Sequence, residues 1–494
     1  MGNFRVCIVG GGLAGSLLAN GLINNGVDTM VFERDEETLK REGYQIRLGD
    51  PALTGLASCL TDSQLESIVK KLGRYSGSSK TAPSICNTKF QTILDLSALP
   101  TYSKSSAINR VVLRDLLLGP VIAEGRVKFG KHFSHYEIIE DGPSGNESVK
   151  VNFTDGSSEY CDILVAADGS GSKVSESCLI PISFHPSITD TELSMQINKQ
   201  IGAKNLVDMK SHVSFLSKGN ATKERLRQLP PRLLNGPILV FKNGISLYYA
   251  LYLPASQQKD GDQDQDDDFD FDENQASFYW SLSVPRELCP FDNPSDIPDR
   301  RQVCLDIVRD WAPEYHVMLS AGAGDEDNIT VTRLRASTKL SKDWRRRLQA
   351  HNGNVREEGH PRVWLVGDAV HAMQPTRQVG SRATRMGGNQ AMRDIADMLP
   401  QLLELKRAAE AGPPLSTREI ETRCNAYEKN MIDRSFAWVA KSGGTSQPIE
   451  ELESADFLKT IDLDGLLGRV ISFLAGLLLP VATILYKTAK RSKQ

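Results

Sequence analysis

Short apolar runs recur along the chain, and three of them end directly on glycine or on a glycine–aspartate pair. They occupy residues 6–9, 163–167 and 363–366, and none contains a charged side chain. Continuous apolar runs of this length are typical of parallel strands that are buried on both faces. Leucines at helical spacing over 17–22 and an extended run over 29–33 follow the first strand. The chain is therefore predicted to open with a β-α-β unit.

Between residues 183 and 290 the pattern becomes typical of antiparallel strands. Two runs, 237–241 and 247–252, flank Asn243-Gly244, which is a favoured hairpin turn. Aromatic residues concentrate on these strands and on the next one, and alternation allows at most half of them to line an apolar pocket. The candidates for that pocket are Tyr248, Tyr249, Tyr252, Phe278, Tyr279 and Trp280.

Two stretches of unusual composition interrupt or follow these elements. Residues 257–276 are rich in aspartate and predict a solvated loop, because so many charges cannot be buried. They lack the glycine and glutamate spacing of a calcium-binding loop. Residues 401–460 are mainly helical in pattern, and residues 461–494 contain an uncharged apolar run over 470–486. The run is near the lower limit for a membrane span, and basic residues follow it. It predicts either membrane contact, by spanning or by lying on the surface, or a helix buried on the body or in an oligomer.

Composition excludes several classes of protein. The 494 residues carry 58 Lys and Arg against 62 Asp and Glu, a net charge of −4, so nucleic acid is not expected as a partner. The eight cysteines are scattered without a Cys-x-x-Cys pair, which excludes a disulfide scaffold and a standard zinc site. We expect no metal. The early strand also leaves no signal-peptide pattern, so we expect a cytoplasmic protein that is not secreted.

A Gly-x-Gly-x-x-Gly turn follows the first strand. Gly10, Gly12 and Gly15 allow a backbone to approach a pyrophosphate, and the following helix N-terminus stabilises its charge. Glu33 ends the second strand, where a carboxylate accepts hydrogen bonds from a ribose diol. The turn predicts a dinucleotide site, although it does not by itself distinguish FAD from NAD.

Two later motifs narrow the choice between FAD and NAD. Asp168-Gly169 ends the second long apolar run, and Gly367-Asp368 ends the third and continues to His371 and Pro375. With these three motifs in this order, residues 4–440 resemble the class A flavoprotein monooxygenases, the family of salicylate hydroxylase-like and p-hydroxybenzoate hydroxylase-like enzymes. The resemblance extends to enzymes of fungal secondary metabolism.

The resemblance implies an α/β fold with a Rossmann-like FAD-binding domain of the glutathione reductase type. A mainly antiparallel β-sheet substrate domain is inserted into it, and a helical region follows. The expected divisions are 1–182 and 291–400 for the two parts of the FAD-binding domain, 183–290 for the substrate domain, 401–460 for C-terminal helices, and 461–494 for a hydrophobic tail.

The resemblance also implies roles for particular residues. Gly10, Gly12, Ala14 and Gly15 would hold the FAD pyrophosphate, Glu33 the adenosine ribose, and Arg34 the adenine end. Arg110 would contact the flavin nucleotide, Gln45 and Arg47 the flavin ring, and Asp168 and Gly169 both FAD and NAD(P)H. Gly367 and Asp368 would hold the ribityl or pyrophosphate part. The helix that begins near Gly388 and Asn389 would stabilise negative charge on the reduced flavin.

Two features depart from the family pattern. Lys173 stands where the family usually has arginine, which keeps the charge but loses the planar fork. The stretch 376–386 is longer than expected between Pro375 and the flavin-side glycines. No catalytic residue is assigned: Arg47 and His371 are weak candidates, and packing beneath the flavin loop explains His371 better than a role as general base.

The predicted activity is an FAD-dependent monooxygenase that uses NAD(P)H and O₂ on a hydrophobic aromatic, polyketide-like or terpenoid-like molecule. In the resembling family the oxidant is a flavin C4a-hydroperoxide. Hydroxylation, epoxidation and ring expansion remain open, as does the choice between NADPH and NADH. Two alternatives stand beside it: a flavin-dependent reductase of isoprenoid double bonds, and a binding protein similar to the GDP-dissociation inhibitors.

Overall fold

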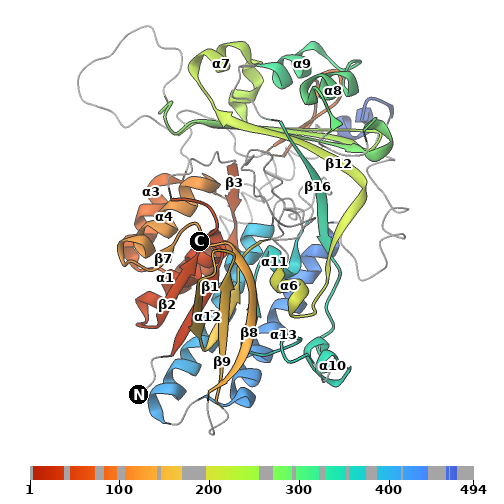
Figure 1. Cartoon of the computed structure of the whole chain (residues 1–494). Coiled ribbons are helices and arrows are strands. Elements are labelled where there is room, and N and C mark those ends of the chain that lie inside the picture. The colour runs from red at the N-terminus through yellow and green to blue at the C-terminus, as the bar shows by residue number, and fades with distance from the viewer. Residues whose placement is uncertain are drawn as a thin grey trace, which may run out of the picture.

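The protein is described here by a computed structural model. It describes residues 4–37, 45–72, 83–96, 106–141, 146–169, 196–254, 271–291, 296–321, 329–351, 355–373, 386–412, 415–442, 463–466 and 468–474. Figure 1 shows a unit built on a parallel sheet below and a large, mainly antiparallel sheet with its own helices above.

The parallel sheet has five strands in the order β17-β11-β1-β2-β7. Every neighbouring pair is parallel, and the central strand β1 is buried because its residues are apolar on both faces. The strands are β1 (Arg5–Val9), β2 (Asp28–Phe32), β7 (Val127–Lys128), β11 (Ile163–Ala166) and β17 (Val363–Leu365). The three apolar runs of the sequence are thus neighbours in one sheet, and the predicted α/β fold is confirmed.

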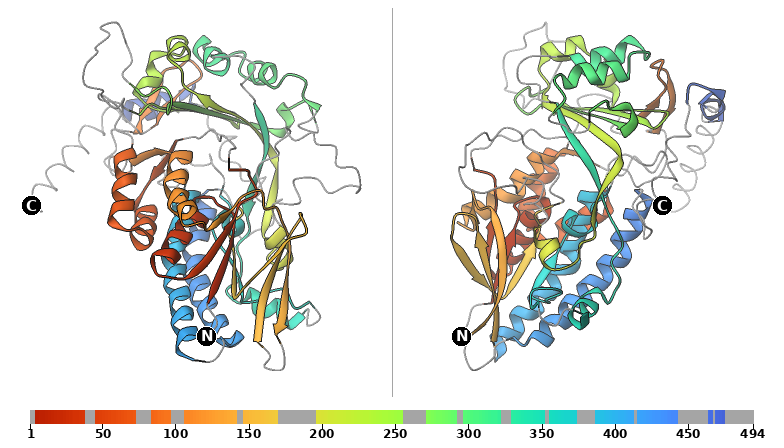
Figure 2. Two further views of the ribbon diagram at one scale, coloured as in Figure 1. Left: turned by 60° about the vertical axis from the view of Figure 1, so that its left-hand side comes forward. Right: turned by 45° about the vertical axis from the view of Figure 1, so that its right-hand side comes forward.

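Helices cover this sheet, and α1 and α12 pack against each other beneath the glycine turn (Figure 2). A separate two-stranded pair, β3 with β6, lies at the upper end of the unit. The elements of this part are β3 (Gln45–Leu48), β6 (Ser106–Asn109), α1 (Leu13–Asn24), α2 (Asp50–Cys59), α3 (Asp62–Lys71), α4 (Arg110–Ala123), α6 (Gln196–Gln200), α10 (Trp344–His351), α11 (Asp368–His371), α12 (Gly387–Ala411) and α13 (Thr417–Lys441).

The upper sheet has seven strands in the order β16-β12-β15-β14-β13-β4-β5. The predicted hairpin is present between β13 and β14, where Asn243 and Gly244 both have positive φ. The strands are β4 (Ser84–Cys86), β5 (Thr92–Asp95), β12 (Leu206–Asn220), β13 (Ile238–Lys242), β14 (Ile245–Tyr252), β15 (Ser277–Pro285) and β16 (Thr330–Ser337). The sheet therefore draws strands from both sides of 183–290 as well as from within it.

The two faces of this sheet have different neighbours. Tyr249, Phe278 and Trp280 lie in the core beneath the upper helices (Figures 1 and 2), which are α7 (Lys223–Gln228), α8 (Arg300–Ile307), α9 (Pro313–Ser320), η4 (Pro231–Asn235) and η5 (Arg286–Leu288). The opposite face packs with Leu463 and Ile471 of the C-terminal segment where Phe241 and Tyr248 lie. Near Ser277 and Tyr252 it adjoins the parallel-sheet unit, where Asn109 Nδ2 donates to Ser277 Oγ over 2.8 Å and the Tyr252 hydroxyl donates to the Lys71 carbonyl over 3.5 Å.

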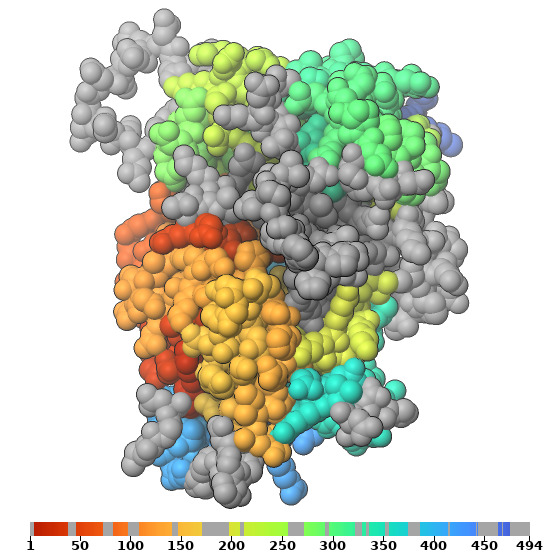
Figure 3. Space-filling view, in the orientation of Figure 1, coloured from red at the N-terminus to blue at the C-terminus, as the bar shows by residue number. Residues whose placement is uncertain are grey.

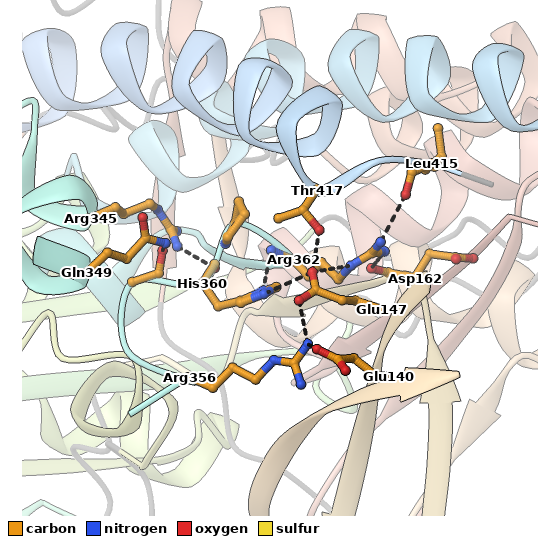
Figure 4. Close-up of polar contacts among 12 residues, drawn as sticks. Glu140, Glu147, Asp162, Arg345, Gln349, Arg356, His360, Arg362, Leu415 and Thr417 are labelled. Carbon is orange, nitrogen blue, oxygen red and sulfur yellow. Dashed lines mark hydrogen bonds and ion pairs between the residues drawn. The ribbon is translucent and has the colours of Figure 1, made fainter. Parts of the chain in front are cut away.

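A three-stranded sheet of β8 (Phe133–Asp141), β9 (Asn146–Phe153) and β10 (Ser158–Cys161) covers one side of the lower unit (Figure 3). Glu147, at the start of β9, connects this three-stranded sheet to neighbouring segments of the lower unit (Figure 4). Its carboxylate accepts hydrogen bonds from Arg356 Nη2 at 2.7 Å and from the Thr417 hydroxyl, and it lies 3.4 Å from His360 Nε2. This cluster ties the hairpin to the segment before β17 and to the start of α13.

The described part of the C-terminal region packs on the edge of the upper sheet. Leu463 is buried against Ile85 and its neighbours, and Asp464 accepts hydrogen bonds from the backbone and hydroxyl of Thr88, each at 2.9 Å. Lys242 Nζ lies 2.9 Å from the same carboxylate. Within the described ranges, no helix has the length and apolar character needed to cross a membrane. Residues 475–486 of the predicted apolar run lie outside those ranges, as does most of the acidic stretch 257–276.

Candidate cofactor site

The three glycines of the first turn have separate roles in the structure. A Cβ on Gly10, where φ is +108°, would lie 2.4 Å from the Ala167 carbonyl oxygen, and a Cβ on Gly15 would lie 2.0 Å from the Gly10 oxygen. A Cβ on Gly12 would meet no atom within 4 Å. The first and third glycines therefore pack strands and helix together. The second keeps an open approach to the N-terminus of α1, as a bound pyrophosphate requires.

Glu33 is buried at the end of β2 and is held beside this turn. Its Oε2 accepts a hydrogen bond of 2.9 Å from the Gly11 amide, and its Oε1 accepts one of 3.1 Å from the Asp35 amide. Glu33 therefore lies beside the glycine turn, and its role as a ribose ligand stays a prediction. Ala14 is buried in the first turn of α1.

Arg114 is a component that the sequence analysis did not assign. It extends from α4, its Nε donates to the Gly11 carbonyl over 2.9 Å, and its Nη2 lies 3.7 Å from Glu33 Oε2. The side chain is buried. Arg114 therefore fixes the glycine turn and compensates the charge of Glu33. Its helical spacing of four residues from Arg110 was the available signal, because it places both on one helix face.

Asp168 and Arg34 approach each other at the ends of β11 and β2. Burial raises the pKa of Asp168 to about 7, and the positive charge of Arg34 opposes that rise. Asp168 Oδ1 is buried and makes no hydrogen bond to any of the residues that the structure describes. Gly169 follows with φ of +75°. An orphaned buried carboxyl oxygen beside the glycine turn fits a site whose ligand supplies the missing partner.

Asp368 begins α11 directly after β17. Its surface is exposed, yet desolvation by the surrounding protein raises its pKa, while the positive charges of His371 and Arg110 oppose that rise. Arg110 and Asp368, 258 positions apart in the sequence, are thus electrostatic neighbours. A Cβ on Gly387 would lie 3.4 Å from Asp368 Oδ1, so the start of α12 adjoins the same carboxylate.

Asn389 connects two of the predicted flavin-side segments. Its Nδ2 donates to the Arg47 carbonyl over 2.8 Å, and its Oδ1 accepts from the Gly49 amide over 2.7 Å. The side-chain amide therefore fixes strand β3 against the first turn of α12. A Cβ on Gly388 would lie 3.6 Å from Leu13 Cδ1, which shows that the N-termini of α1 and α12 adjoin. Two helix N-termini at one place favour a ligand with several negative charges.

A buried ionic network lies behind Asp368. His371 Nε2 is 2.6 Å from Asp394 Oδ2, and both side chains are fully buried. The same oxygen accepts a hydrogen bond of 3.0 Å from the Gly367 amide, and Arg434 Nη2 donates to Asp394 Oδ1 over 2.7 Å. Burial opposes the charged imidazole, but Asp394 outweighs it and raises the pKa of His371. The structure thus places His371 where it supports the loop that carries Asp368.

Several predicted positions are only partly described. For Gln45 the structure describes only the backbone, which pairs with that of Asn109 between strands β3 and β6. Lys173 and residues 374–385, which include most of the long 376–386 stretch, lie outside the described ranges. Within those ranges no cluster of His, Cys, Asp or Glu has the arrangement of a metal site.

Comparison with known proteins shows which proteins this chain resembles. Residues 3–47 match the family model of the FAD binding domain. The FAD-dependent monooxygenase dbaB of Emericella nidulans is 32% identical over 176 residues, which are 34% of this chain and 40% of that protein. The dual O-methyltransferase/FAD-dependent monooxygenase CTB3 of Cercospora beticola is 23% identical over 450 residues, 87% of this chain and 45% of that protein. The chain thus covers less than half the length of these two relatives.

The fold agrees with these matches. Klebsiella pneumoniae HpxO, solved in complex with FAD and uric acid, superposes with a TM-score of 0.59 at 18% identity and covers 97% of each chain. The predicted resemblance to class A flavoprotein monooxygenases is therefore confirmed, together with the predicted fold. FAD is the cofactor that the family match supports.

Proposed function

We propose that the protein is an FAD-dependent monooxygenase that uses NAD(P)H and O₂ to oxidise a hydrophobic aromatic, polyketide-like or terpenoid-like molecule in secondary metabolism. The observation that carries the proposal is the open approach at Gly12, surrounded by Glu33, the orphaned Asp168 and the accessible Asp368. The relatives named above support the same class of reaction.

The residues present divide the work of holding FAD. Gly12 and the α1 N-terminus would take the pyrophosphate, Glu33 the ribose, and Asp368 with Arg110 the polar chain beyond it. Arg114 positions the glycine turn, and Asn389 positions strand β3, which carries Gln45 and Arg47. Bound FAD supplies the redox chemistry between NAD(P)H and O₂. The protein's contribution is to bind, to orient and to exclude water.

The proposal is tested with full-length protein reconstituted with FAD. We expect a yellow protein that oxidises NADPH or NADH with matching O₂ consumption, and that transfers ¹⁸O from ¹⁸O₂ to a product when a panel of aromatic compounds is supplied. NAD(P)H oxidation that reduces an isoprenoid double bond without O₂ uptake would support the reductase alternative. A colourless protein that binds no added FAD would support the binding-protein alternative.

We further propose that the C-terminal segment contacts an anionic membrane surface. Leu466 and Phe473 are 78% and 69% exposed although the same segment is anchored through Leu463 and Asp464. In the sequence this segment continues as an uncharged run to residue 486, followed by four basic residues. Exposed apolar side chains next to basic residues are the combination that anionic interfaces bind.

Flotation with vesicles that contain phosphatidylserine tests this contact. The double variant Leu466→Asp/Phe473→Asp is expected to reduce the vesicle-bound fraction at least about fivefold, because charged residues do not enter the interface. Leu288→Asp, which replaces an exposed leucine on η5, is the matched control and leaves binding unchanged. Equal binding of all three proteins contradicts the proposed contact.

A further inference from the structure

A row of serines crosses the face of the upper sheet that is turned toward the parallel-sheet unit. Ser214 of β12 pairs with Ser283 of β15, and Ser283 pairs with Ser246 of β14, so the three are directly opposite one another on adjacent strands. Ser281, two residues before Ser283, lies on the same face. Each of these four side chains is at least nine-tenths buried.

The alternation of side chains along each strand determines which face of the sheet the serines occupy. Ile245 and Leu247 on either side of Ser246 belong to the core beneath the upper helices, as do Leu282 and Val284 on either side of Ser283. The serines therefore point away from those helices, toward the unit that carries the candidate cofactor site. Six residues further along these strands, Ser277 and Tyr252 bond to Asn109 and Lys71 of that unit, so this end of the same face adjoins it.

Ser246 is 2% exposed, and its hydroxyl makes no hydrogen bond to the described part of the chain. A buried hydroxyl without a partner is unfavourable, so such a group in a native fold calls for a ligand or an ordered water. A tyrosine pair lies beside the row: Ser281 is opposite Tyr248, whose ring centroid is 6.2 Å from that of Tyr279, and one side of the pair belongs to the apolar cluster that contains Leu463. Hydroxyls next to two aromatic rings suit a ligand that is both aromatic and oxygenated.

We propose that Ser246 and Ser283 form a substrate subsite that binds two oxygen atoms in a 1,3 relation on an aromatic ring. Directly opposite residues on adjacent strands hold their side chains about 5 Å apart. Oxygens on alternate carbons of a benzene ring have nearly that separation, whereas oxygens on neighbouring carbons are much closer together. The inference rests on the proposed function, which it deepens by naming the substrate pattern and the residues that read it.

Calorimetric titration of FAD-loaded protein with two isomeric probes tests the subsite. Wild-type protein is expected to bind 1,3-dihydroxynaphthalene at least about fivefold more tightly than 2,3-dihydroxynaphthalene. Ser246→Ala and, independently, Ser283→Ala each weaken binding of the 1,3 isomer about tenfold, the effect of one lost hydrogen bond, and change binding of the 2,3 isomer little.

Ser217→Ala is the matched control. Ser217 lies on the same sheet, is 1% exposed and also has a hydroxyl without a partner, but it faces the upper helices. It is expected to alter the affinity for neither isomer. A wild-type preference for the 2,3 isomer, binding of neither isomer, or equal effects of Ser246→Ala and Ser217→Ala would overturn the proposed subsite. Oxygen consumption measured on the same preparations separates these outcomes from failure of the proposed function.

Discussion

Asp394→Asn is expected to destabilise the protein by about 3–5 kcal/mol, the usual cost of removing one partner from a buried ion pair. The variant leaves His371 and Arg434 without the carboxylate that both now contact in the interior. It also weakens the support of the Gly367 amide, so FAD affinity is expected to fall together with stability. Urea unfolding and titration of the protein with FAD measure the two effects.

Asp397→Asn provides the control for this variant. Asp397 lies on the same helix and also contacts Arg434, at 2.9 Å, but it does not contact His371 and is partly exposed. We expect Asp397→Asn to lower the free energy of unfolding by about 1 kcal/mol or less. Comparable losses in the two variants would contradict a special role for the buried pair.

The stability difference between wild type and Asp394→Asn is also expected to depend on pH. Asp394 raises the pKa of His371 above its usual 6.5, and His371 and Arg434 lower the pKa of Asp394 below its usual 3.8 against the effect of burial. The contribution of a raised histidine is fully present below pH 6.5 and is lost as pH rises through the folded-state value. The difference should therefore be largest near pH 4–6.5 and decline at higher pH, which unfolding curves at several pH values will show.

Gly12→Ala is expected to abolish tight FAD binding while leaving the fold intact. The backbone at Gly12 has φ −76° and ψ −170°, which alanine adopts, and its Cβ would meet no protein atom within 4 Å. The same Cβ would occupy the approach to the α1 N-terminus, so we expect the Kd for FAD to rise at least about tenfold. The protein without cofactor should be unchanged or slightly more stable, because alanine restricts the unfolded chain.

Gly15→Ala separates the two roles of the turn. Its Cβ would lie 2.0 Å from the Gly10 oxygen, so the backbone has to move and the protein itself is destabilised, by about 3 kcal/mol or more. Thermal unfolding of both variants without FAD distinguishes them. If Gly12→Ala bound FAD normally, the pyrophosphate would have to lie elsewhere.

Much of the fold follows from local patterns in the sequence. The three apolar runs became neighbouring parallel strands because a strand without polar positions has to be buried on both faces. The Asn243-Gly244 turn also follows from the sequence, since both positions need positive φ. The short strands 84–86 and 92–95 were not predicted as part of the upper sheet, because three or four residues carry too little periodicity and the pairing partner is distant in the sequence.

The candidate site, like the fold, has residues that the sequence predicts and residues that it does not. Glycine spacing and residues directly after strands identify Gly12, Glu33, Asp168 and Asp368, because strand ends in a parallel sheet meet at one edge. Supporting contacts are different: the bond from Asn389 to Arg47 and the pairing of Asp394 with His371 join residues 342 and 23 positions apart. A single sequence contains no periodic signal for such pairs. Stretch 376–386 and the role of Lys173 stay predictions.

The pairing order of the two main sheets has a consequence for synthesis of the chain. β1 of the lower unit pairs with β11, which pairs with β17, and the upper sheet adds its last strand only at residues 330–337. The upper sheet can be complete once translation has passed Ser337, but the lower sheet only once it has passed Leu365, which takes roughly 20–70 s at common elongation rates. Until then β11 has β1 beside it but lacks β17, so one edge of this apolar strand stays unpaired during most of the synthesis of the chain.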